Sequence, residues 1–484
     1  MLYNLDNQTY PGNVAIFMNQ NNHYPLFYQK MAAQGLKSSV TEAFEYYYNL
    51  LLSGEKGKIY ESEITNILPG DLLDLNTMDY ESQGLEVLNK TVIIKLNGGL
   101  GTTMGLGLNM AKSLLPIKHG YSFLEIYFHQ IQKLKTSMPI PLILMNSFNT
   151  HKKTMAALKQ MRAENDVEFF LQNMFPKVDQ QTYKPAHWPQ NPQLEWNPPG
   201  HGEIYTAFKS SGMLEKCLNM GIEYAFISNS DNLGAQLNLS ILGYFAQKQL
   251  PFIMEVVRRG LSDTKGGHLA QYRQNGQLIL REMTQCPEEE LHLFQDIYHY
   301  QFFNTNNLWI NLKVLADYLN MHSFVRLPMI CNPKHVDPTD PTSPDVYQLE
   351  TAMGNAISVF ENSQAVIVDH DRYIPIKRNA QLLAVWSDCY LYDPKKSLHP
   401  NPKRQLEPIN IHLDPKYFAH FDQFASRFPN GAPSLVHCNK LRVIGDVRFE
   451  ANVVLKGEVV IENTTDQPMI IKENQCIEND CVKQ

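Results

Sequence analysis

The stretch IIKLNGGLGTTMGLGLNMAKS, residues 93–113, holds five glycines, two threonines and a final Lys-Ser pair, and it has no carboxylate. The β-branched run TVIIKL, Thr91 to Leu96, ends in glycines and therefore predicts a buried strand that leads into a loop. Glycines let a backbone approach a ligand closely, and their amides can face an anion. The stretch predicts a phosphate-binding loop, to which Lys112 adds a charge and for which Lys95 is a second candidate.

The spacing of this loop excludes two common phosphate-binding motifs. A Walker loop ends in Gly-Lys-Ser or Gly-Lys-Thr, but here Ala111 precedes Lys112, and Leu106 stands where the first glycine should be. A dinucleotide-binding GxGxxG motif that began at Gly105 would need a glycine at Met110. Composition alone leaves open a tight glycine turn with an exposed lysine.

Short apolar runs similar to Thr91–Leu96 recur along the chain and alternate with helical stretches. They are IPLILM near Leu142, EYAFIS near Phe226, PFIMEVV near Met254, LWINL near Trp309 and AVIVDH near Val368. This alternation predicts an α/β fold with a central, mostly parallel, Rossmann-like sheet flanked by helices. Ligands of such sheets bind beyond the carboxyl ends of the strands. Before the sheet, YPLFYQKMAAQGL and VTEAFEYYYNLLLSG predict two helices, the second ending near Gly54.

The tail LRVIGDVRFEANVVLKGEVVIEN has a six-residue period. Three series share it: Leu441, Val447, Val453 and Val459; Val443, Phe449, Leu455 and Ile461; and Gly445, Ala451 and Gly457. A small residue in phase at each corner favours a parallel β-helix over the alternative, an antiparallel meander. The exposed end of such a coil is often covered by a second copy, so we expect a homo-oligomer that forms through it.

Composition limits the classes of partner. The chain has 484 residues, 43% of them hydrophobic, and a net charge of −7, which predicts two or three domains without a basic field for nucleic acid or anionic membrane. No apolar run approaches the roughly 20 residues of a membrane helix. The odd number of cysteines, seven, and the absence of a CxxC pair favour reduced thiols and a cytoplasmic location. The N-terminus does not have the pattern of a signal peptide.

The string KLNGGLGTTMG followed by KS resembles the nucleotide-binding loop of the UTP–glucose-1-phosphate uridylyltransferase (UDP-glucose pyrophosphorylase) family. The likeness continues in order through FLQN, PPGHGEIY, ISNSDNLGA, NTNNLWINL, QLETAMGNAI and YIPIKRNAQLL, and it covers nearly all of the chain beyond about residue 20. This sequence departs from the family's strings at three places. LGLNMAK replaces a Gly-Pro-Lys stretch, His268 stands in the usual KGGTL, and Glu203 replaces the aspartate of GHGD.

The resemblance implies a helical region over residues 1–85, a nucleotidyltransferase domain over 86–385, and a C-terminal domain over 386–484 with a left-handed β-helix from about residue 436. It implies the reversible reaction of UTP with glucose 1-phosphate to give UDP-glucose and pyrophosphate, with Mg²⁺ as cofactor. The sugar phosphate is itself an ionised nucleophile, so no Ser-His-Asp or Cys-His set is needed, and none is found in the sequence. The protein must align and screen two phosphates that repel each other.

The resemblance also implies the catalytic and metal-binding residues. Lys112 should reach the UTP phosphates, Lys377 in IPIKR should approach the reacting phosphates from the opposite side, and Asp231 should hold Mg²⁺ beyond the strand EYAFIS. The alternatives are an exposed lysine, a lysine at a strand end, and a helix-capping aspartate.

The same resemblance implies the substrate-binding residues. They are Leu96, Asn97, Gly98 and Gly99 in the loop; Gln172 and Gly200 for uracil; His201 for the sugar phosphate; and Asn229, Glu282 and Asn306 for the glucose hydroxyls. The amide of Gln172 matches the uracil edge, and Asn and Glu suit neighbouring hydroxyls that donate and accept. Asn304 and Asn307 share the string of Asn306 and remain alternatives to it.

Two other functions remain open at this level. One is a pyrophosphorylase for UDP-N-acetylglucosamine or for several UDP-sugars, although the NTNNLW and SNSDNLGA strings favour glucose. The other is a UDP-sugar-binding regulator that has lost catalysis. The presence of Lys112, Asp231 and Lys377 together argues against the regulator, because binding alone does not require all three.

Overall fold

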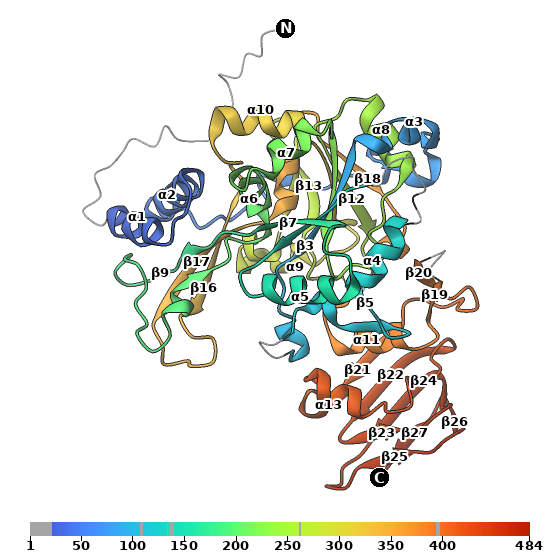
Figure 1. Ribbon diagram of the computed structural model, residues 1–484. Coiled ribbons are helices and arrows are strands. Elements are labelled where there is room, and N and C mark those ends of the chain that lie inside the picture. Colours follow the sequence, from blue (N-terminus) through green and yellow to red (C-terminus); the bar gives the residue numbers. More distant parts are fainter. Residues whose placement is uncertain (1–21, 107–109, 133, 135–139, 261–262, 394–396) are drawn as a thin grey trace.

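The computed structural model describes residues 22–106, 110–132, 134, 140–260, 263–393 and 397–484 (Figure 1). Two parts of the chain discussed above lie outside these residues. They are the N-terminal segment, which does not have the pattern of a signal peptide, and residues 107–109 of the LGLNMAK stretch. No described helix is long and apolar enough to cross a bilayer.

A sheet of eleven strands forms the centre of the described chain. Its main path runs in the order β2 (Leu73–Asp74), β18 (Gln364–Ile367), β12 (Phe252–Arg258), β15 (Phe302–Asn311), β11 (Tyr224–Asn229), β3 (Thr91–Asn97), β6 (Leu142–Asn146) and β7 (Val167–Leu171). Neighbouring strands on this path are parallel except at β15, which is antiparallel to both β11 and β12. The predicted mostly parallel sheet is confirmed, and every apolar run that predicted a strand forms one.

Helices cover both faces of this sheet. Because side chains alternate along a strand, Ile93 and Ile94 of β3 point to opposite faces and belong to two separate cores. The core of Ile93 is closed by α4 (Phe123–Gln132) and α8 (Leu239–Gln247). The core of Ile94 is closed by α6 (Ile204–Ser210), α7 (Met213–Asn219) and α10 (Leu312–His322).

The reversed strand β15 places its first residues at the carboxyl edge of the sheet. Its residue Phe302 pairs with Arg258 at the end of β12, and Leu308 pairs with Ile227 near the end of β11. The NTNN string therefore lies where the loops that follow the parallel strands also lie. The sequence did not predict this reversal, because an apolar pattern reports burial and not strand direction.

The two predicted N-terminal helices are present as α1 (Tyr24–Ala33) and α2 (Ser38–Leu52). Gly54 follows α2 with φ 88°, the left-handed conformation that commonly ends a helix. The rings of Phe27 and Phe44 are 4.9 Å apart, and Phe44 also contacts Phe175. Both helices pack beside the small sheet of β16 (Met329–His335), β17 (Asp345–Thr351) and β9 (Val178–Asp179) (Figure 1).

Parallel strands build the C-terminal region, which extends from one end of the body (Figure 1). They are β21 (Asn410–Leu413), β22 (Cys438–Ile444), β23 (Val447–Phe449), β24 (Val454–Glu462), β25 (Met469–Ile471), β26 (Cys476–Glu478) and β27 (Cys481–Lys483). Leu441 pairs with Val459 and Val443 with Ile461, a step of three six-residue repeats. The apolar members of the repeat are buried, as the six-residue period predicts.

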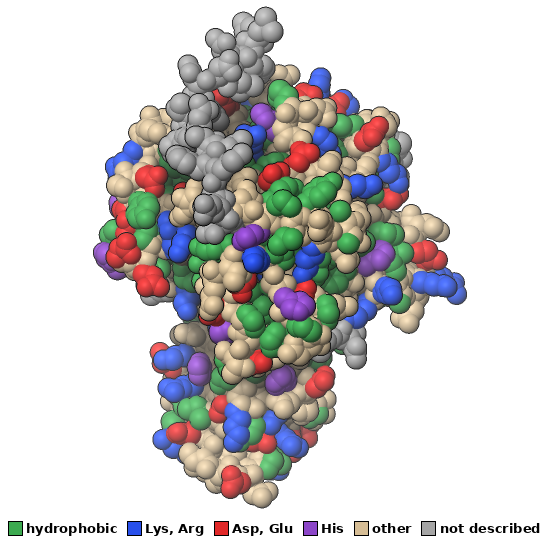
Figure 2. Space-filling view, turned by 90° about the vertical axis from the view of Figure 1, so that its left-hand side faces the viewer, with side chains coloured by type: hydrophobic (Ala, Val, Ile, Leu, Met, Phe, Trp, Pro, Cys, Tyr) green, Lys and Arg blue, Asp and Glu red, His purple; other side chains and the backbone are tan. Residues whose placement is uncertain are grey.

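The outer surface of this region is highly charged. Figure 2 shows it as a narrower lobe on which basic and acidic side chains alternate. Ion pairs join successive strands across it: Lys440–Glu458, Lys456–Glu478, Lys472–Glu450 and Lys483–Glu462. Exposed pairs of this kind contribute about 0–1 kcal/mol each, so the stability of the lobe comes from its buried repeat residues.

Candidate active site

The glycine loop leaves β3 at Asn97 and folds back on itself. The backbone N–H of Lys112 donates to the carbonyl of Gly99 at 3.3 Å, which closes the loop. Gly105 has φ 62°, and an added Cβ there would lie 2.5 Å from Nδ1 of His420. Only glycine fits at this position, where the C-terminal region packs against the loop.

Lys112 and Asp231 are brought together at the end of this loop. Asp231 lies two residues beyond the end of β11, and its Oδ2 is 2.6 Å from Nζ of Lys112. Both side chains are largely buried, with 10% and 16% of their surface exposed. Oδ1 of Asp231 is also buried and has no hydrogen-bond partner in the described chain. The predicted phosphate-binding lysine and the predicted metal-binding carboxylate are thus in direct contact.

The second candidate for phosphate binding, Lys95, is buried and engaged in other contacts. Its Nζ donates to Oγ of Ser228 at 2.7 Å and to the carbonyl of Ala235 at 2.8 Å, and it lies 4.8 Å from the centre of the Tyr127 ring. Burial lowers the pKa of Lys95 to about 7. Lys95 therefore links β11 to the loop that carries Asp231, and the structure does not support it as a phosphate ligand.

Lys377, in a different part of the chain, lies near enough to the same carboxylate for the two charges to interact. Desolvation lowers the pKa of Lys377, but Tyr373, Asp231 and Glu282 raise it by more, so the net shift is upward and the ammonium stays charged. The carbonyl of Lys377 accepts a hydrogen bond from Oγ1 of Thr103 at 2.8 Å. The glycine loop and the segment of Lys377 are therefore joined directly.

Gln172 and Gly200 are in contact, as expected for two residues that read one base. Nε2 of Gln172 donates to the carbonyl of Gly200 at 2.8 Å. An added Cβ at Gly98 would lie 3.3 Å from Oε1 of Gln172, so this amide lies between the two glycine segments. Its carbonyl oxygen faces the glycine loop and is the acceptor that a base can use.

His201 is held as a neutral donor. Its Nδ1 accepts a hydrogen bond from the backbone N–H of Met353 at 3.0 Å, so the proton of the neutral ring is on Nε2. Burial, assisted by the positive charge of Lys377, lowers the pKa of His201 to about 4. The ring is therefore neutral at pH 7 and offers Nε2–H to an anion.

The structure distinguishes the three asparagines of the NTNN string. Asn307 is fully buried and donates to Glu255 and to the carbonyl of Arg372. Asn304 is buried and is engaged with Asn306 through two hydrogen bonds. Asn306 is half-buried and has φ 59°, a left-handed conformation that turns it out of the strand. Its position fits the sugar contact that the resemblance implies.

The other predicted ligands lie around the same edge. Asn229 ends β11 and is the register partner of the buried Leu96. Asn97 donates from Nδ2 to Asn146 and Thr154, so its side chain joins β3 to the neighbouring strand and to α5 (His151–Met161). Burial raises the pKa of Glu282, and an added Cβ at Gly267 would lie 2.6 Å from its Oε2.

The donor set fits a metal ion that is shared with the substrate. The described residues contain no group of three or more His, Cys, Asp or Glu side chains that could hold a metal alone. Mg²⁺ in nucleotide sites usually takes one or two carboxylates and completes its shell with phosphate oxygens and water. The buried, unpartnered Oδ1 of Asp231 is suited to that arrangement.

Glu203 is a residue of this region that sequence reasoning treated only as a departure from the family. Its carboxylate accepts hydrogen bonds from the backbone N–H and from Nδ2 of Asn173, the neighbour of Gln172. It therefore ties the Gln172 segment to the segment of Gly200 and His201. Burial raises the pKa of Glu203 to about 8, well above its ordinary value.

This shift predicts how the stability of the protein depends on pH. Between about pH 4.5 and 8 the folded chain keeps a proton on Glu203 that the unfolded chain releases, so this contribution to stability falls as pH rises. In urea titrations, Glu203→Gln should gain stability relative to the parent between pH 5 and pH 8, by up to about 1.36 kcal/mol per unit of pH. Glu164→Gln, at an exposed position, is the control. A constant difference between Glu203→Gln and the parent would contradict the prediction.

Comparison with known proteins identifies the family. The family model for UTP–glucose-1-phosphate uridylyltransferase matches residues 41–456. A UTP–glucose-1-phosphate uridylyltransferase from Hordeum vulgare is 37% identical over 441 residues, which cover 88% of this chain and 90% of that protein. The match therefore includes the sheet, the glycine loop and most of the C-terminal region.

Solved structures agree over a still larger part of the chain. A mutant UDP-glucose pyrophosphorylase from Leishmania major, in complex with UDP-glucose, has a TM-score of 0.88 and 38% identity, with 95% of this chain and 99% of that chain covered. A UDP-glucose phosphorylase from Trypanosoma brucei has a TM-score of 0.87 and 40% identity at the same coverage. With the family model and these relatives in agreement over most of its length, the chain belongs to the UTP–glucose-1-phosphate uridylyltransferase family.

Proposed function

We propose that Lys112, Asp231 and Lys377 carry out the family's reaction in this chain. As a nucleotidyltransferase of this family, the chain makes UDP-glucose and pyrophosphate reversibly from UTP and glucose 1-phosphate. One observation supports the assignment most strongly. The lysine of the glycine loop contacts Asp231 at 2.6 Å, and the charge of the same carboxylate acts on Lys377, which belongs to another segment.

The reaction needs alignment and charge screening more than proton transfer. An oxygen of glucose 1-phosphate attacks the α-phosphorus of UTP, the new P–O bond forms, and the bond to the β-phosphate oxygen breaks. The electron pair of that bond leaves with pyrophosphate. Lys112 would hold the UTP phosphates, and Lys377 would neutralise charge that develops during transfer. No base is required because the attacking oxygen is already ionised.

The remaining predicted residues orient the substrates. The contact between Gln172 and Gly200 supports a uracil site beside Gly98 and Gly99. The Nε2–H of neutral His201 would donate to the sugar phosphate. Asn229, Glu282 and Asn306 would bind the glucose hydroxyls, and the conformation of Asn306 supports its choice over Asn304 and Asn307.

We assign the cofactor as Mg²⁺ held by Asp231. The free Oδ1 atom of Asp231 supports this assignment, with substrate phosphates and water as the other ligands. Bound there, Mg²⁺ would screen the phosphate charge.

We also propose that the chain divides into domains at about residues 85 and 385 and that a left-handed β-helix begins at about residue 436. We propose further that the chain assembles through this β-helix and that its location is cytoplasmic. The parallel pairing of the C-terminal strands and the burial of the six-residue repeat support the β-helix. The exposed Ile470 on β25 offers an apolar contact for a second copy.

Selectivity for glucose tests the substrate assignment. We expect kcat/KM for glucose 1-phosphate to exceed that for N-acetylglucosamine 1-phosphate by about 5- to 160-fold, because an added acetamido group has to displace packed site residues at a cost of about 1–3 kcal/mol. Pyrophosphate release with UTP, Mg²⁺ and a panel of sugar 1-phosphates measures the ratio. Similar values for the two sugars would favour the broad UDP-sugar pyrophosphorylase, and no release with any sugar would favour the regulator.

A further inference from the structure

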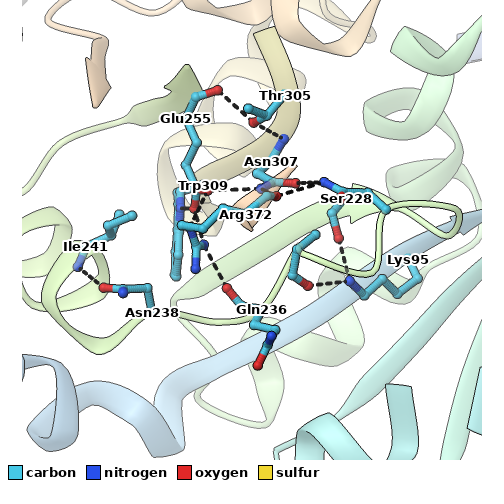
Figure 3. A network of polar contacts seen from close by, with 12 residues as sticks. Lys95, Ser228, Gln236, Asn238, Ile241, Glu255, Thr305, Asn307, Trp309 and Arg372 are labelled. Atoms are coloured by element: carbon cyan, nitrogen blue, oxygen red, sulfur yellow. Dashed lines mark hydrogen bonds and ion pairs between the residues drawn. The ribbon is translucent and has the colours of Figure 1, made fainter. Parts of the chain in front are cut away.

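A carboxylate lies in the middle of the buried strand β12. Glu255 is fully buried between apolar neighbours, and it forms an ion pair with Arg372, at the end of a short helical turn (His370–Arg372) (Figure 3). Nε of Arg372 is 2.8 Å from Oε2 of Glu255, and Nη2 is 2.6 Å from Oε1, so the pair is bidentate. In the described part of the chain, neither side chain is hydrogen-bonded to a residue predicted to bind substrate.

Each oxygen of Glu255 also accepts one further hydrogen bond. Trp309 donates from Nε1 to Oε1, and Asn307 donates from Nδ2 to Oε2, both at 3.0 Å. Both residues belong to β15, which lies beside β12. The carboxylate is therefore completely satisfied by three residues from two separate segments, and the orientation of the Arg372 side chain is fixed.

The network continues into the two segments that carry Asp231 and Lys377. Nη2 of Arg372 donates to the carbonyl of Gln236, in the loop that follows β11. The carbonyl of Arg372 accepts from Nδ2 of Asn232 at 3.1 Å. Oδ1 of Asn232 in turn accepts from the backbone N–H of Ile374 at 2.8 Å. Figure 3 shows the side chain of Arg372 with contacts to the carboxylate of Glu255 and to the backbone carbonyl of Gln236.

Main-chain contacts complete the connection. The backbone N–H of Ile376 donates to the carbonyl of Asp231 at 3.0 Å, and Asn232 and Pro375 form an isolated antiparallel bridge. An added Cβ at Gly234 would lie 2.3 Å from the carbonyl oxygen of Asp371, so the two segments are in close contact. Asp231 is directly next to Asn232, and Lys377 is directly next to Ile376. The buried Glu255–Arg372 pair is thus connected by hydrogen bonds to the segment that carries Asp231 and to the segment that carries Lys377.

We propose that Glu255 and Arg372 are positioning residues that hold Asp231 and Lys377 at the correct separation for transfer, an inference that rests on the roles proposed above for those two. A buried ion pair is often no more stabilising than apolar side chains of the same volume, so stability alone does not account for it. The need to position the catalytic groups accounts for the pair, because a displacement of about 1 Å in a catalytic group can cost about 100-fold in rate.

The test replaces Arg372 with lysine, which keeps the charge but cannot form the bidentate contact. Arg372→Lys should lower kcat by about 10-fold or more, change KM for UTP and glucose 1-phosphate by less than about threefold, and raise the Mg²⁺ concentration needed for half-maximal rate. Arg427→Lys is the matched control, since Arg427 is about as buried as Arg372 and forms an ion pair with Asp446 in the C-terminal region. It should lower the melting temperature but change kcat by less than about twofold.

Several results would overturn the proposal. A folded Arg372→Lys with kcat within about threefold of the parent would do so, and so would a loss confined to KM. If Arg372→Lys does not fold, the double variant Glu255→Leu with Arg372→Met removes both charges at similar volume. A folded double variant with parental kcat overturns the proposal, and a folded double variant whose kcat is lower by about 10-fold or more supports it. If neither variant folds, the pair is assigned to stability and the proposal is overturned. Lys377→Ala and Asp231→Asn are assayed in parallel. If these two keep parental kcat, the proposed catalytic roles fail, and the inference falls with them.

Discussion

Lys377→Ala is expected to lower kcat by about 100-fold or more while changing KM for UTP by less than about threefold. Tyr373, Asp231 and Glu282 raise the pKa of Lys377 and keep it charged, and in the role proposed above it acts on the charge that gathers as the bond to pyrophosphate breaks. A group that acts on developing charge contributes in the transition state and little to substrate binding, so its loss appears in kcat. Removal of one such donor from a preorganised site typically costs about 100- to 1,000-fold.

Steady-state rates of pyrophosphate formation at saturating Mg²⁺ measure this effect. Arg378→Ala is the matched control, because Arg378 is next to Lys377, is exposed as Lys377 is, and carries the same charge. It should retain kcat within about threefold. Equal losses of kcat in the two variants would mean that the rate depends on the overall positive charge of this segment and that Lys377 has no specific role.

Lys112 and Asp231 should act as one unit in a double-mutant cycle. Lys112→Ala should reduce kcat/KM for UTP by about 10- to 200-fold, since a charge-assisted contact is worth roughly 1.5–3 kcal/mol. Asp231→Asn keeps the shape and loses the charge, and it should raise the Mg²⁺ requirement and reduce kcat by a similar factor. The double variant should lose less than the product of the two, because the side chains are 2.6 Å apart and each single change leaves a charge without its partner.

The control pair for this cycle is Lys90 and Glu223, which are 2.9 Å apart but about half exposed. Exposed pairs contribute about 0–1 kcal/mol, so Lys90→Ala and Glu223→Gln should leave the kinetics unchanged. Strict multiplication of the Lys112 and Asp231 effects would show that the two residues act independently. A parental Mg²⁺ titration for Asp231→Asn would reduce Asp231 to a structural partner of Lys112.

The sheet was predictable from sequence because its strands are short apolar runs with glycine or polar residues after them. TVIIKL and EYAFIS became β3 and β11 with the expected bounds to within a residue. The reversal of β15 was not predictable, because LWINL carries the same apolar signal in either direction. The six-residue period of the tail did predict which side chains are buried, since every apolar member lies inside.

The position of a candidate residue in the fold was predictable where the residue follows a strand end, as Asp231 and Gln172 do. The side-chain partners were not, because they depend on segments far apart in the chain. In the sequence Lys95 is a second candidate for phosphate beside Lys112, but in the structure its ammonium donates to Ser228. One further signal was available. Glu255 interrupts the apolar run PFIMEVV, and a charge inside a buried strand requires a buried partner, which proved to be Arg372.

The contact between Gly105 and His420 has a consequence for how the enzyme is made. The glycine loop emerges early in synthesis, but the residue that packs against it is about 300 residues further along, which takes roughly 15 to 60 s at 5–20 residues per second. The buried side chain of Asn379 also finds its hydrogen-bond partners in this segment, because it donates to the carbonyls of Phe418 and Ala419. A nascent chain therefore carries its glycine loop without the packing partner of Gly105 for most of translation. We expect a ribosome-stalled chain that ends before His420 to be inactive even when its sheet has already formed.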